Sequence, residues 1–503
     1  MLHNIKVDFG AASAPLRASQ QTSSLLRVYS FPVSHKVLKE TLTQLLAVTS
    51  ALVGCARAAN FEFGADTALV VVQHMLWQTV DLLRAVADMG QRLENVFALG
   101  KVYSNSRPVI RTISEMGVTV TESTTPAPGS FNESFEQDVK RLWEVVGSVL
   151  ARRDIKRIIV LDDAGACITN VPRELLRGYS FTGVEQTSLG VFVFEEKPPP
   201  FAVISWARSA VKSQIGGPMF SHCLIEKLNA EFLNGKPLQG QPMGIIGLGS
   251  IGSGMADLSA RQGNKVLFYD PDPDLPIPSH LRERVVRLGS LEELMIGCEY
   301  VFGCSGRNPF KDHWPIAHRP GIKLFSGSSG DQEFLPIIMD LKGRPDFKIR
   351  CDFGDLTSDA GPSGPILIAY YGYPYNFVSR QGEAVPTQIV QLETAGLLAG
   401  LMQARIHLGL CEKGEAQNNG VHRMSPAAQS FVYRSWLKEM RGLSINVKKR
   451  FGYGSELLSA ASHDQWFVQN SEPHPGSGYE PALGCEEVMR QIVDDRHIRA
   501  DLF

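Results

Sequence analysis

Three glycines with the spacing G-x-G-x-x-G are the part of this sequence that most directly suggests chemistry. They follow a short apolar run, Met243 to Ile246, which is typical of a buried strand, and they precede a helical segment. At such a turn the first glycine permits the bend, the second leaves room for a pyrophosphate, and the third lets the helix pack closely. Backbone N–H groups at the start of the helix attract the phosphates. The predicted phosphate contacts of a bound dinucleotide are Gly247, Gly249, Ser250, Ile251 and Gly252.

An acidic residue at the end of the next predicted strand indicates which dinucleotide binds. The strand runs from Val266 to Tyr269, and Asp270 follows it. A carboxylate at this place accepts hydrogen bonds from the ribose hydroxyls of NAD. It repels the 2′-phosphate of NADP by roughly 1–4 kcal/mol, depending on the surroundings. A G-x-G-x-x-G spacing alone also occurs in ordinary turns, but together with the strand and the acid it predicts NAD as the cofactor.

Apolar runs alternate with amphipathic segments along most of the chain, as parallel sheets with connecting helices require. Before the glycine turn this alternation ends with a strand at Arg157 to Asp162. We expect an α/β fold with two doubly wound Rossmann-like domains, a substrate domain and an NAD-binding domain, joined by hinge helices. From Cys411 onward the chain is more polar, and we predict an irregular extension. After the glycine turn, strands are predicted at 284–288, 299–303, 322–326, 347–353 and 366–371, and a long helix at 385–408.

Composition excludes several classes of function. The 503 residues are too many for one core, and the formal net charge of −2 provides no basic surface for nucleic acid or an anionic membrane. No signal peptide is apparent, and the apolar stretch Leu45 to Cys55 is too short to span a bilayer. The eight cysteines form no CxxC, and no group of residues has metal-ligand spacing. We therefore expect a cytoplasmic protein with no metal, no membrane contact and no nucleic-acid partner.

Several segments resemble, in chain order, the S-adenosylhomocysteine hydrolase family. LDDAGA at 161–166 is similar to that family's LDDGGD, GVEQTSLGV at 183–191 to its SEETTTGV segment, and AVISWARSAVKSQ at 202–214 to its VTKSK segment. The glycine turn and YDPDP at 269–273 also match, so the resemblance covers roughly residues 60–410. It implies a homo-oligomeric enzyme whose NAD oxidises a ribose hydroxyl transiently and takes its hydride back after elimination and addition.

The resemblance also implies roles for particular residues. Lys212 stands where the family has the lysine that deprotonates the 3′-hydroxyl. His74 and Asp163 stand where its histidine and aspartate transfer protons near C4′ and C5′. Thr187 and Ser188 stand where hydroxyl groups bind the nicotinamide half. A single lysine or histidine is more often structural, so the collinear match is the reason to expect Lys212, His74 and Asp163 to be catalytic.

Other family residues are replaced here, and these replacements change the expected substrate. A site built to hydrogen-bond a polar group discriminates strongly against molecules that cannot replace its partners. We therefore expect a small nucleoside or sugar-like substrate other than S-adenosylhomocysteine. The replaced positions are Leu76, Gln78, Gln186, Gly216, Ser329 and Val385, which stand for a threonine, two glutamates, an aspartate and two histidines.

We expect the site to lie in a cleft between two domains. The predicted segments are a substrate domain over 1–205 completed by a helix over 385–410, a hinge helix over 206–235, an NAD-binding domain over 236–365, and a C-terminal extension of unknown role over 411–503. The predicted reaction is transient oxidation of a ribosyl or sugar hydroxyl, followed by elimination, hydrolysis or epimerisation.

Two alternatives remain open. An NAD-dependent dehydrogenase of a small hydroxy acid needs an arginine for the carboxylate and a histidine–carboxylate pair. Arg307 is a candidate for the arginine, but the sequence does not reveal a matching pair. A catalytically silent NAD-binding regulator is the other alternative, because several residues that the resemblance requires are replaced.

Overall fold

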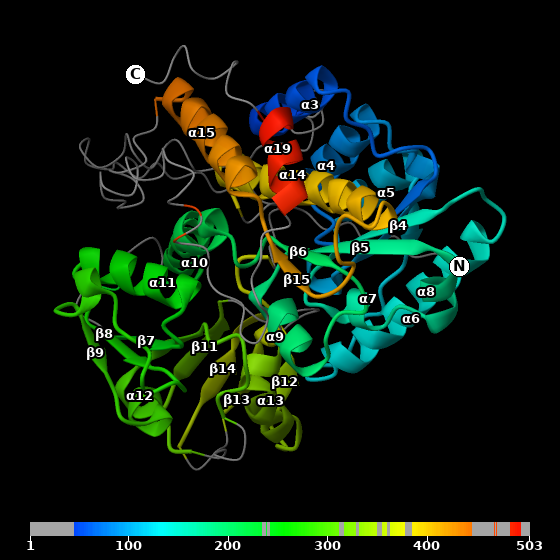
Figure 1. Ribbon diagram of the computed structural model, residues 1–503. Coiled ribbons are helices and arrows are strands. Elements are labelled where there is room, and N and C mark those ends of the chain that lie inside the picture. The colour runs from blue at the N-terminus through cyan, green and yellow to red at the C-terminus, as the bar shows by residue number, and fades with distance from the viewer. Residues whose placement is uncertain are drawn as a thin grey trace, which may run out of the picture. The chain divides into compact units, whose positions relative to one another are not determined.

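The computed structural model describes most of the chain from residue 45 onward. It contains two β-sheets with helices packed against them (Figure 1). The predicted α/β fold with two Rossmann-like sheets is therefore confirmed. The described residues are 45–233, 238, 242–310, 316–327, 331–349, 355–359, 363–377, 385–444, 467, 469 and 483–493.

The first sheet is entirely parallel, with the strand order β15-β6-β5-β4-β1-β2-β3. All residues of β1 and β2 are buried, as expected for strands covered on both faces. The direction of strand addition reverses between β1 and β4, and open α/β sheets bind their ligands in the crevice at such a reversal, beyond the carboxyl ends of the strands. The strands are β1 (Thr67–Gln73), β2 (Val96–Gly100), β3 (Thr119–Thr121), β4 (Arg157–Asp162), β5 (Ser180–Glu185), β6 (Val203–Ser205) and β15 (Val421–Arg423).

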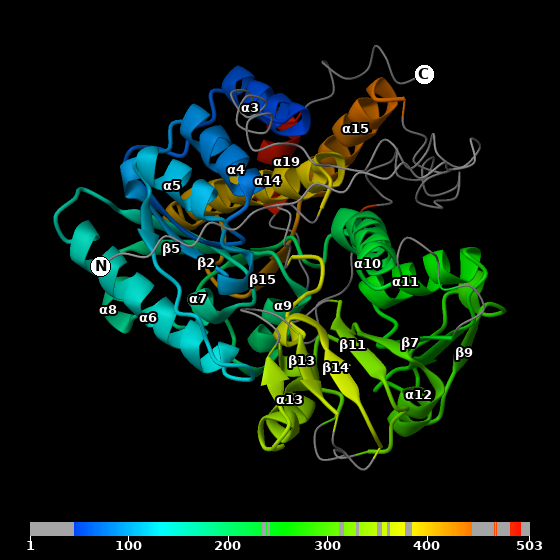
Figure 2. The ribbon, with the colours of Figure 1, turned by 180° about the vertical axis from the view of Figure 1, so that it is seen from behind.

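Two groups of helices cover this sheet, one on each face (Figures 1 and 2). One group consists of α3 (Ala47–Ala58), α4 (Trp77–Asp88), α5 (Arg107–Glu115) and the long helix α14 (Thr387–Glu412). The other group consists of α6 (Phe131–Leu150), α7 (Ala166–Thr169) and α8 (Arg173–Gly178). Helix α14 comes late in the chain but packs on β4, β5 and β6, which explains why it is apolar over most of its surface.

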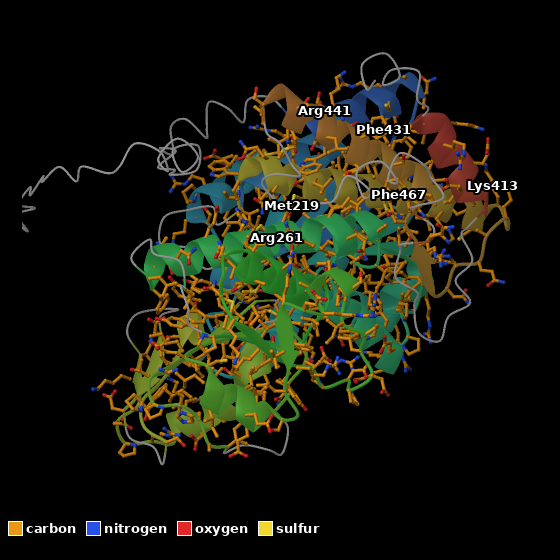
Figure 3. All side chains as sticks on the ribbon, turned by 90° about the vertical axis from the view of Figure 1, so that its left-hand side faces the viewer. Met219, Arg261, Lys413, Phe431, Arg441 and Phe467 are labelled. Carbon is orange, nitrogen blue, oxygen red and sulfur yellow. The ribbon has the colours of Figure 1, made fainter. Side chains whose placement is uncertain are left out.

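The second sheet contains the glycine turn and has the order β12-β13-β14-β11-β10-β7-β8-β9, with β13 antiparallel to its neighbours. Helices α10 (Gly217–Glu231) and α11 (Ser250–Arg261) lie side by side, and Figure 3 marks them by Met219 and Arg261. Helices α12 (Leu291–Gly297) and α13 (Leu335–Lys342) also pack on this sheet. The strands are β7 (Met243–Ile246), β8 (Val266–Tyr269), β9 (Val285–Arg287), β10 (Tyr300–Gly303), β11 (Ile322–Ser326), β12 (Lys348–Ile349), β13 (Leu356–Ser358) and β14 (Ile366–Ile368).

The structure corrects the expectation of an irregular C-terminal extension. Strand β15 pairs with β6 at the edge of the first sheet, and α15 (Pro426–Gly442) and α19 (Leu483–Ile492) pack against α14. A strand of three residues is too short to show a periodic hydrophobic pattern, so the local sequence could not predict that β15 joins the sheet. None of the helices in the described part of the chain is long and apolar enough to cross a membrane.

Close packing between α14 and Trp206 gives a test of this arrangement. A Cβ added at Gly396 would lie 2.3 Å from the Trp206 ring, which is buried and held by a 2.8 Å hydrogen bond from its Nε1 to Glu393. We expect Gly396→Ala to lower the free energy of unfolding by about 1–3 kcal/mol, because the ring cannot move aside. Gly409, on the same helix, has only the flexible side chain of Arg405 nearby. Gly409→Ala should therefore be neutral or stabilising by up to about 1 kcal/mol in urea denaturation. Equal stabilisation by both substitutions would contradict this packing.

Candidate functional site

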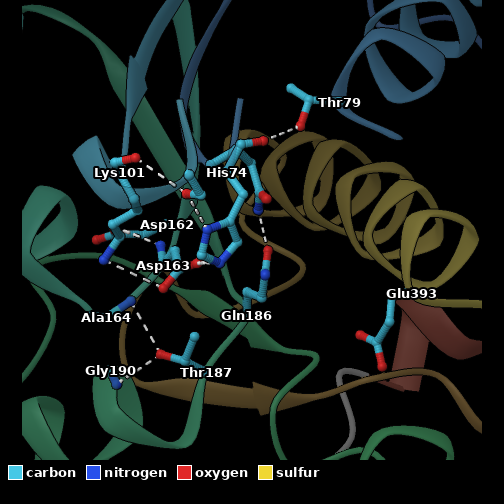
Figure 4. Close-up of polar contacts among 12 residues, drawn as sticks. His74, Thr79, Lys101, Asp162, Asp163, Ala164, Gln186, Thr187, Gly190 and Glu393 are labelled. Atoms are coloured by element: carbon cyan, nitrogen blue, oxygen red, sulfur yellow. Dashed lines mark hydrogen bonds and ion pairs between the residues drawn. The ribbon is translucent and has the colours of Figure 1, made fainter. Parts of the chain in front are cut away.

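Three neighbouring strands of the first sheet deliver titratable side chains to one place (Figure 4). His74 follows β1, Asp163 follows β4 and Lys101 follows β2. His74 Nε2 lies 3.3 Å from Asp163 Oδ2, and Lys101 Nζ lies 3.4 Å from Asp163 Oδ1. All three side chains are at most 7% exposed. They lie at the carboxyl ends of the strands where the strand order reverses, which is the place expected for a ligand site.

The imidazole of His74 is held from several sides. Its Nδ1 lies 2.6 Å from Ser104 Oγ, and its backbone carbonyl accepts a hydrogen bond from Thr79 Oγ1 at 2.6 Å. The ring of Phe377 stacks on it at 3.8 Å between centroids. Burial lowers the pKa of His74 to about 4; the charge of Asp163 opposes this shift, and those of Lys101 and Lys212 add to it. His74 is therefore uncharged at neutral pH in this structure.

Three carboxyl groups lie close together beneath this site. Burial raises the pKa of Asp162 to about 6 and that of Glu185 well above its usual value. Burial also acts to raise the pKa of Asp163, but Lys101 above all, with His74 and Lys212, brings it below its usual value. Asp162 accepts the backbone N–H groups of Asp163 and Ile168, both at 2.8 Å, and so fixes the turn after β4. In that turn the non-glycine residue Ala164 has φ +88°, a strained conformation of the kind that gathers at functional sites.

Lys212 lies on a π-helical turn, Val211–Gly216, that runs directly into α10. Its Nζ is 2.7 Å from Glu393 Oε2 on α14, and its side chain is 24% exposed. Gly216 allows this pair, since a Cβ there would lie 2.4 Å from the other Glu393 oxygen. The carboxylate partner of Lys212 is thus supplied by α14. The structure brings His74 and Asp163 into contact, whereas the contact of Lys212 is with Glu393, and its charge acts on the other two from a distance.

The predicted nicotinamide contacts lie at the start of α9 (Ser188–Glu196), beside this cluster. Thr187 caps the helix: its Oγ1 accepts from the backbone N–H of Gly190 at 3.1 Å and donates to Glu185 at 2.7 Å. Ser188 is exposed. The replaced position Gln186 accepts a hydrogen bond from Gln73 Nε2. Thr187 and Ser188 therefore remain predicted contacts of the nicotinamide. The hydroxyl group of Thr187 is already hydrogen-bonded within the fold.

The glycine turn has the geometry that a dinucleotide requires. Gly247 has φ +90° and a Cβ there would lie 2.6 Å from the backbone of Ser305, while a Cβ at Gly252 would lie 1.9 Å from Gly247 O. At Gly249, in contrast, no atom lies within 4 Å of an added Cβ. The first and third glycines are thus needed by the fold, whereas the second leaves space for a phosphate to approach the backbone. Asp270 accepts the backbone N–H of Leu248 at 2.6 Å and so lies against this turn.

The segment after β14 connects the two sheets. The backbone N–H of Tyr375 donates to Ser326 O, at the carboxyl end of β11, at 2.8 Å, and Phe377 reaches His74. Tyr373 stacks at 4.7 Å between ring centroids on Tyr103, which lies in the helical turn after β2 of the first sheet. His74 therefore lies next to a segment attached to the ligand-binding edge of the second sheet. At the start of this segment Tyr370 and Tyr371 both have positive φ, and the hydroxyl groups of Tyr370 and Tyr375 donate to Glu231 on α10.

Arg307 lies in the loop after β10, at the same edge of the second sheet. Its guanidinium is 4.2 Å from the ring centroid of Phe192 on α9 and 3.8 Å from Glu195. Arg208, after β6, packs on the same ring at 5.4 Å. Arg307 is 60% exposed, so it is accessible to a ligand.

Sequence reasoning missed Lys101 and Glu393. Lys101 directly follows a buried strand, as His74 and Asp163 do. This position was a signal in the sequence that Lys101 lies beside them. Glu393 gave no local signal, since it stands in a long apolar helix and meets Lys212 only through the fold. Ser329 lies outside the described residues.

Comparison with known proteins identifies the second sheet. Residues 223–313 match the family model for the NAD binding domain of D-isomer specific 2-hydroxyacid dehydrogenases. The chain thus carries an NAD-binding domain, and the predicted cofactor is confirmed. Two proteins of Mycobacterium tuberculosis, "Uncharacterized protein MT0113" and "Uncharacterized protein Rv0104", are 25% identical over 358 residues, which are 69% of this chain and 68% of theirs.

Solved structures also show similarity at low identity. D-2-hydroxyisocaproate dehydrogenase is 12% identical with a TM-score of 0.29, covering 70% of this chain and 99% of that one. D-lactate dehydrogenase from Escherichia coli is 13% identical with a TM-score of 0.32, covering 69% and 97%. TM-scores of this size do not establish a common arrangement of the whole chain.

These findings correct the assignment to the S-adenosylhomocysteine hydrolase family, which is wrong. The matching model is that of 2-hydroxyacid dehydrogenases. The error has a physical origin, because the glycine turn and the following acid serve NAD in the same way in many Rossmann domains. The short upstream segments resembled the hydrolase family in spacing but had lost many of its polar side chains.

The glycine geometry predicts that fold and cofactor binding can be separated. We expect Gly249→Val to abolish NAD binding, measured by calorimetry, because the valine side chain would occupy the place of the phosphate. The melting temperature should change little, because the folded protein has space for this side chain. Gly252→Ala should instead destabilise the domain, because its Cβ overlaps Gly247 O. Unimpaired NAD binding by a folded Gly249→Val variant would show that the dinucleotide does not approach this turn.

The position of Asp270 predicts a preference for NAD over NADP. The guanidinium that could hold a 2′-phosphate, Arg287 at the end of β9, is bound to backbone carbonyls at Pro273 and Leu275. We expect NADP to bind about 5- to 1000-fold more weakly, from a repulsion of about 1–4 kcal/mol. Calorimetry should show that Asp270→Ser reduces this ratio, whereas Asp257→Ser, on α11, leaves it unchanged. Equal affinities of the parent protein for both cofactors would contradict the prediction.

Proposed function

We propose that this chain is an NAD-dependent oxidoreductase that interconverts a small hydroxy acid and the corresponding oxo acid. The observation that carries the proposal is the buried contact between His74 and Asp163, at 3.3 Å, which provides a histidine–carboxylate pair. The match of residues 223–313 to the NAD-binding domain of 2-hydroxyacid dehydrogenases supports the same reaction class. When bound, NAD accepts the hydride from the carbon that carries the hydroxyl group.

In this proposal His74 takes the proton of the hydroxyl group. The ring is uncharged in the structure, and Asp163 stabilises the imidazolium that forms. Burial is the largest cause of the low pKa of His74, so this value belongs to a ring covered by Phe377. A polar substrate in place of Phe377 restores part of the lost solvation and brings the pKa closer to the range in which a base works.

Two cations serve the substrate's oxygen atoms. The partly exposed ammonium of Lys212 hydrogen-bonds the reacting oxygen, where negative charge develops as the proton leaves. Arg307 holds the carboxylate, since its exposed guanidinium lies at the edge of the second sheet and can form a bidentate pair. Glu393 holds Lys212 in place at 2.7 Å.

A second candidate is a reaction that oxidises a ribosyl or sugar hydroxyl only transiently and leaves NAD unchanged at the end. The Lys212–Glu393 pair favours it, because it adds a second proton-handling group to His74 and Asp163. In that reaction Lys212 would take the proton of the hydroxyl group, and His74 together with Asp163 would take a proton in a later step. Net NADH separates the two reactions, because only the dehydrogenase forms one NADH for each substrate molecule.

A spectroscopic assay with matched variants tests the proposal. With excess NAD and a panel of 2-hydroxy acids, the purified protein should form NADH over many turnovers, measured at 340 nm. Removing a charged hydrogen-bond donor costs about 1.5–3 kcal/mol, so Arg307→Gln should raise KM about 10- to 100-fold. His74→Gln should lower kcat by about 10²–10⁴. Arg441→Gln, exposed at the end of α15, is the control and should match the parent.

The other outcomes of this assay are equally informative. Partial reduction of bound NAD by nucleosides or sugars, without turnover of hydroxy acids, would favour the transient reaction. A protein that binds NAD but forms no NADH with any compound of either panel would overturn the proposal in favour of a catalytically silent regulator.

A further inference from the structure

Lys101 is among the most deeply buried cations of the described chain. Its side chain is 3% exposed, whereas lysine is almost never buried unless it is paired. Its ammonium lies 3.4 Å from Asp163 Oδ1 and faces the rings of Phe135 at 4.4 Å and Phe131 at 5.7 Å. The aromatic faces and a single carboxylate thus replace the water that the ammonium loses.

The backbone of Lys101 is tied to the same site. Its N–H donates to Gln73 O at 3.3 Å, across from β1. Its carbonyl accepts from Ser104 Oγ at 3.1 Å, and that hydroxyl also lies 2.6 Å from His74 Nδ1. The end of β2 therefore fixes the ammonium relative to both Asp163 and His74.

The charges around this cation are unbalanced. Asp162, Asp163 and Glu185 are buried together, and Lys101 is the cation at hydrogen-bonding range of one of them. It lies beside Asp163, and that group is the one whose pKa falls, while burial raises the pKa values of the other two. Among the three carboxyl groups, Lys101 therefore favours the charged form of Asp163 most directly.

We propose that Lys101 is a positioning residue that pairs with the Asp163 carboxylate and thereby weakens the attraction of that carboxylate for a proton on the His74 imidazole. Without this ammonium, the imidazole would be the nearest group able to balance Asp163, and its proton affinity would rise. A protonated ring cannot act as the base. The other groups that face His74 are Lys212, Ser104, Tyr103 and Phe377, and of these only Lys212 carries a charge.

The role of Lys101 in catalysis rests on the proposed function, but its effect on His74 can be measured without substrate. Full-length protein labelled with ¹⁵N-histidine is titrated by NMR, and His74 is assigned from the spectrum of His74→Gln. In the parent, His74 should stay uncharged down to about pH 4. Lys101→Met, which keeps the length of the side chain, should raise the proton affinity of His74 tenfold or more. Lys101→Arg should keep it near the parent value.

A double substitution covers the case in which Lys101→Met does not fold. An unpaired buried charge is strongly destabilising, whereas removing both partners of a pair is often tolerated. Lys101→Met with Asp163→Asn should therefore be more stable than Lys101→Met alone in urea denaturation. It should also lose the increase in the proton affinity of His74.

Two results would overturn the proposal. One is a folded Lys101→Met variant in which His74 titrates as in the parent. The other is a double variant no more stable than an unfolded Lys101→Met. Failure to oxidise hydroxy acids would instead count against the proposed function and would leave the titration result standing.

Discussion

The charge balance of a small buried cluster at the carboxyl edge of the first sheet is the constraint on which the rest of the site depends. Neighbouring strands are directly followed by His74, Asp163 and Lys101, and the side chains of these three residues are almost completely buried. In such surroundings an unpaired charge is costly, so each group must be balanced by another within a few ångströms. The order β4-β1-β2 supplies that balance, because parallel neighbours place their last residues side by side.

A second constraint ties the two sheets together through groups that lie far apart in the chain. Glu393 on α14 reaches Lys212, 181 residues earlier, because Gly216 leaves the space for its carboxylate. The same carboxylate accepts the Trp206 indole N–H at 2.8 Å, and Trp206 in turn packs against Gly396. The packing of α14 on the first sheet therefore also fixes the position of Lys212.

These relations explain what could be predicted from the sequence. The glycine turn, Asp270 and the long strands of both sheets carry their signals within a few residues, and so the fold class and the cofactor could be predicted. Lys101 and Glu393 acquire partners only through long-range contacts, and β15 is too short for a pattern. The family assignment failed for a related reason, since it combined a glycine turn that many NAD-binding domains share with short upstream segments that had lost several of the family's polar residues. His74 and Asp163 are in contact and Lys212 pairs with Glu393, but the roles of these residues remain predictions.

The segment from Tyr370 to Phe377 contacts both of the places where ligands are expected. It is hydrogen-bonded to the end of β11, where the nucleotide domain receives its cofactor, and its last residue covers His74. In the proposed function, a substrate that reached His74 would displace Phe377, and the displacement would act on a segment that is anchored to the second sheet. Because such coupling is reciprocal, a cofactor that loosens this segment increases the affinity for substrate by the same factor by which substrate increases the affinity for cofactor. The strength of this coupling would depend on this short peptide, with its two tyrosines at positive φ.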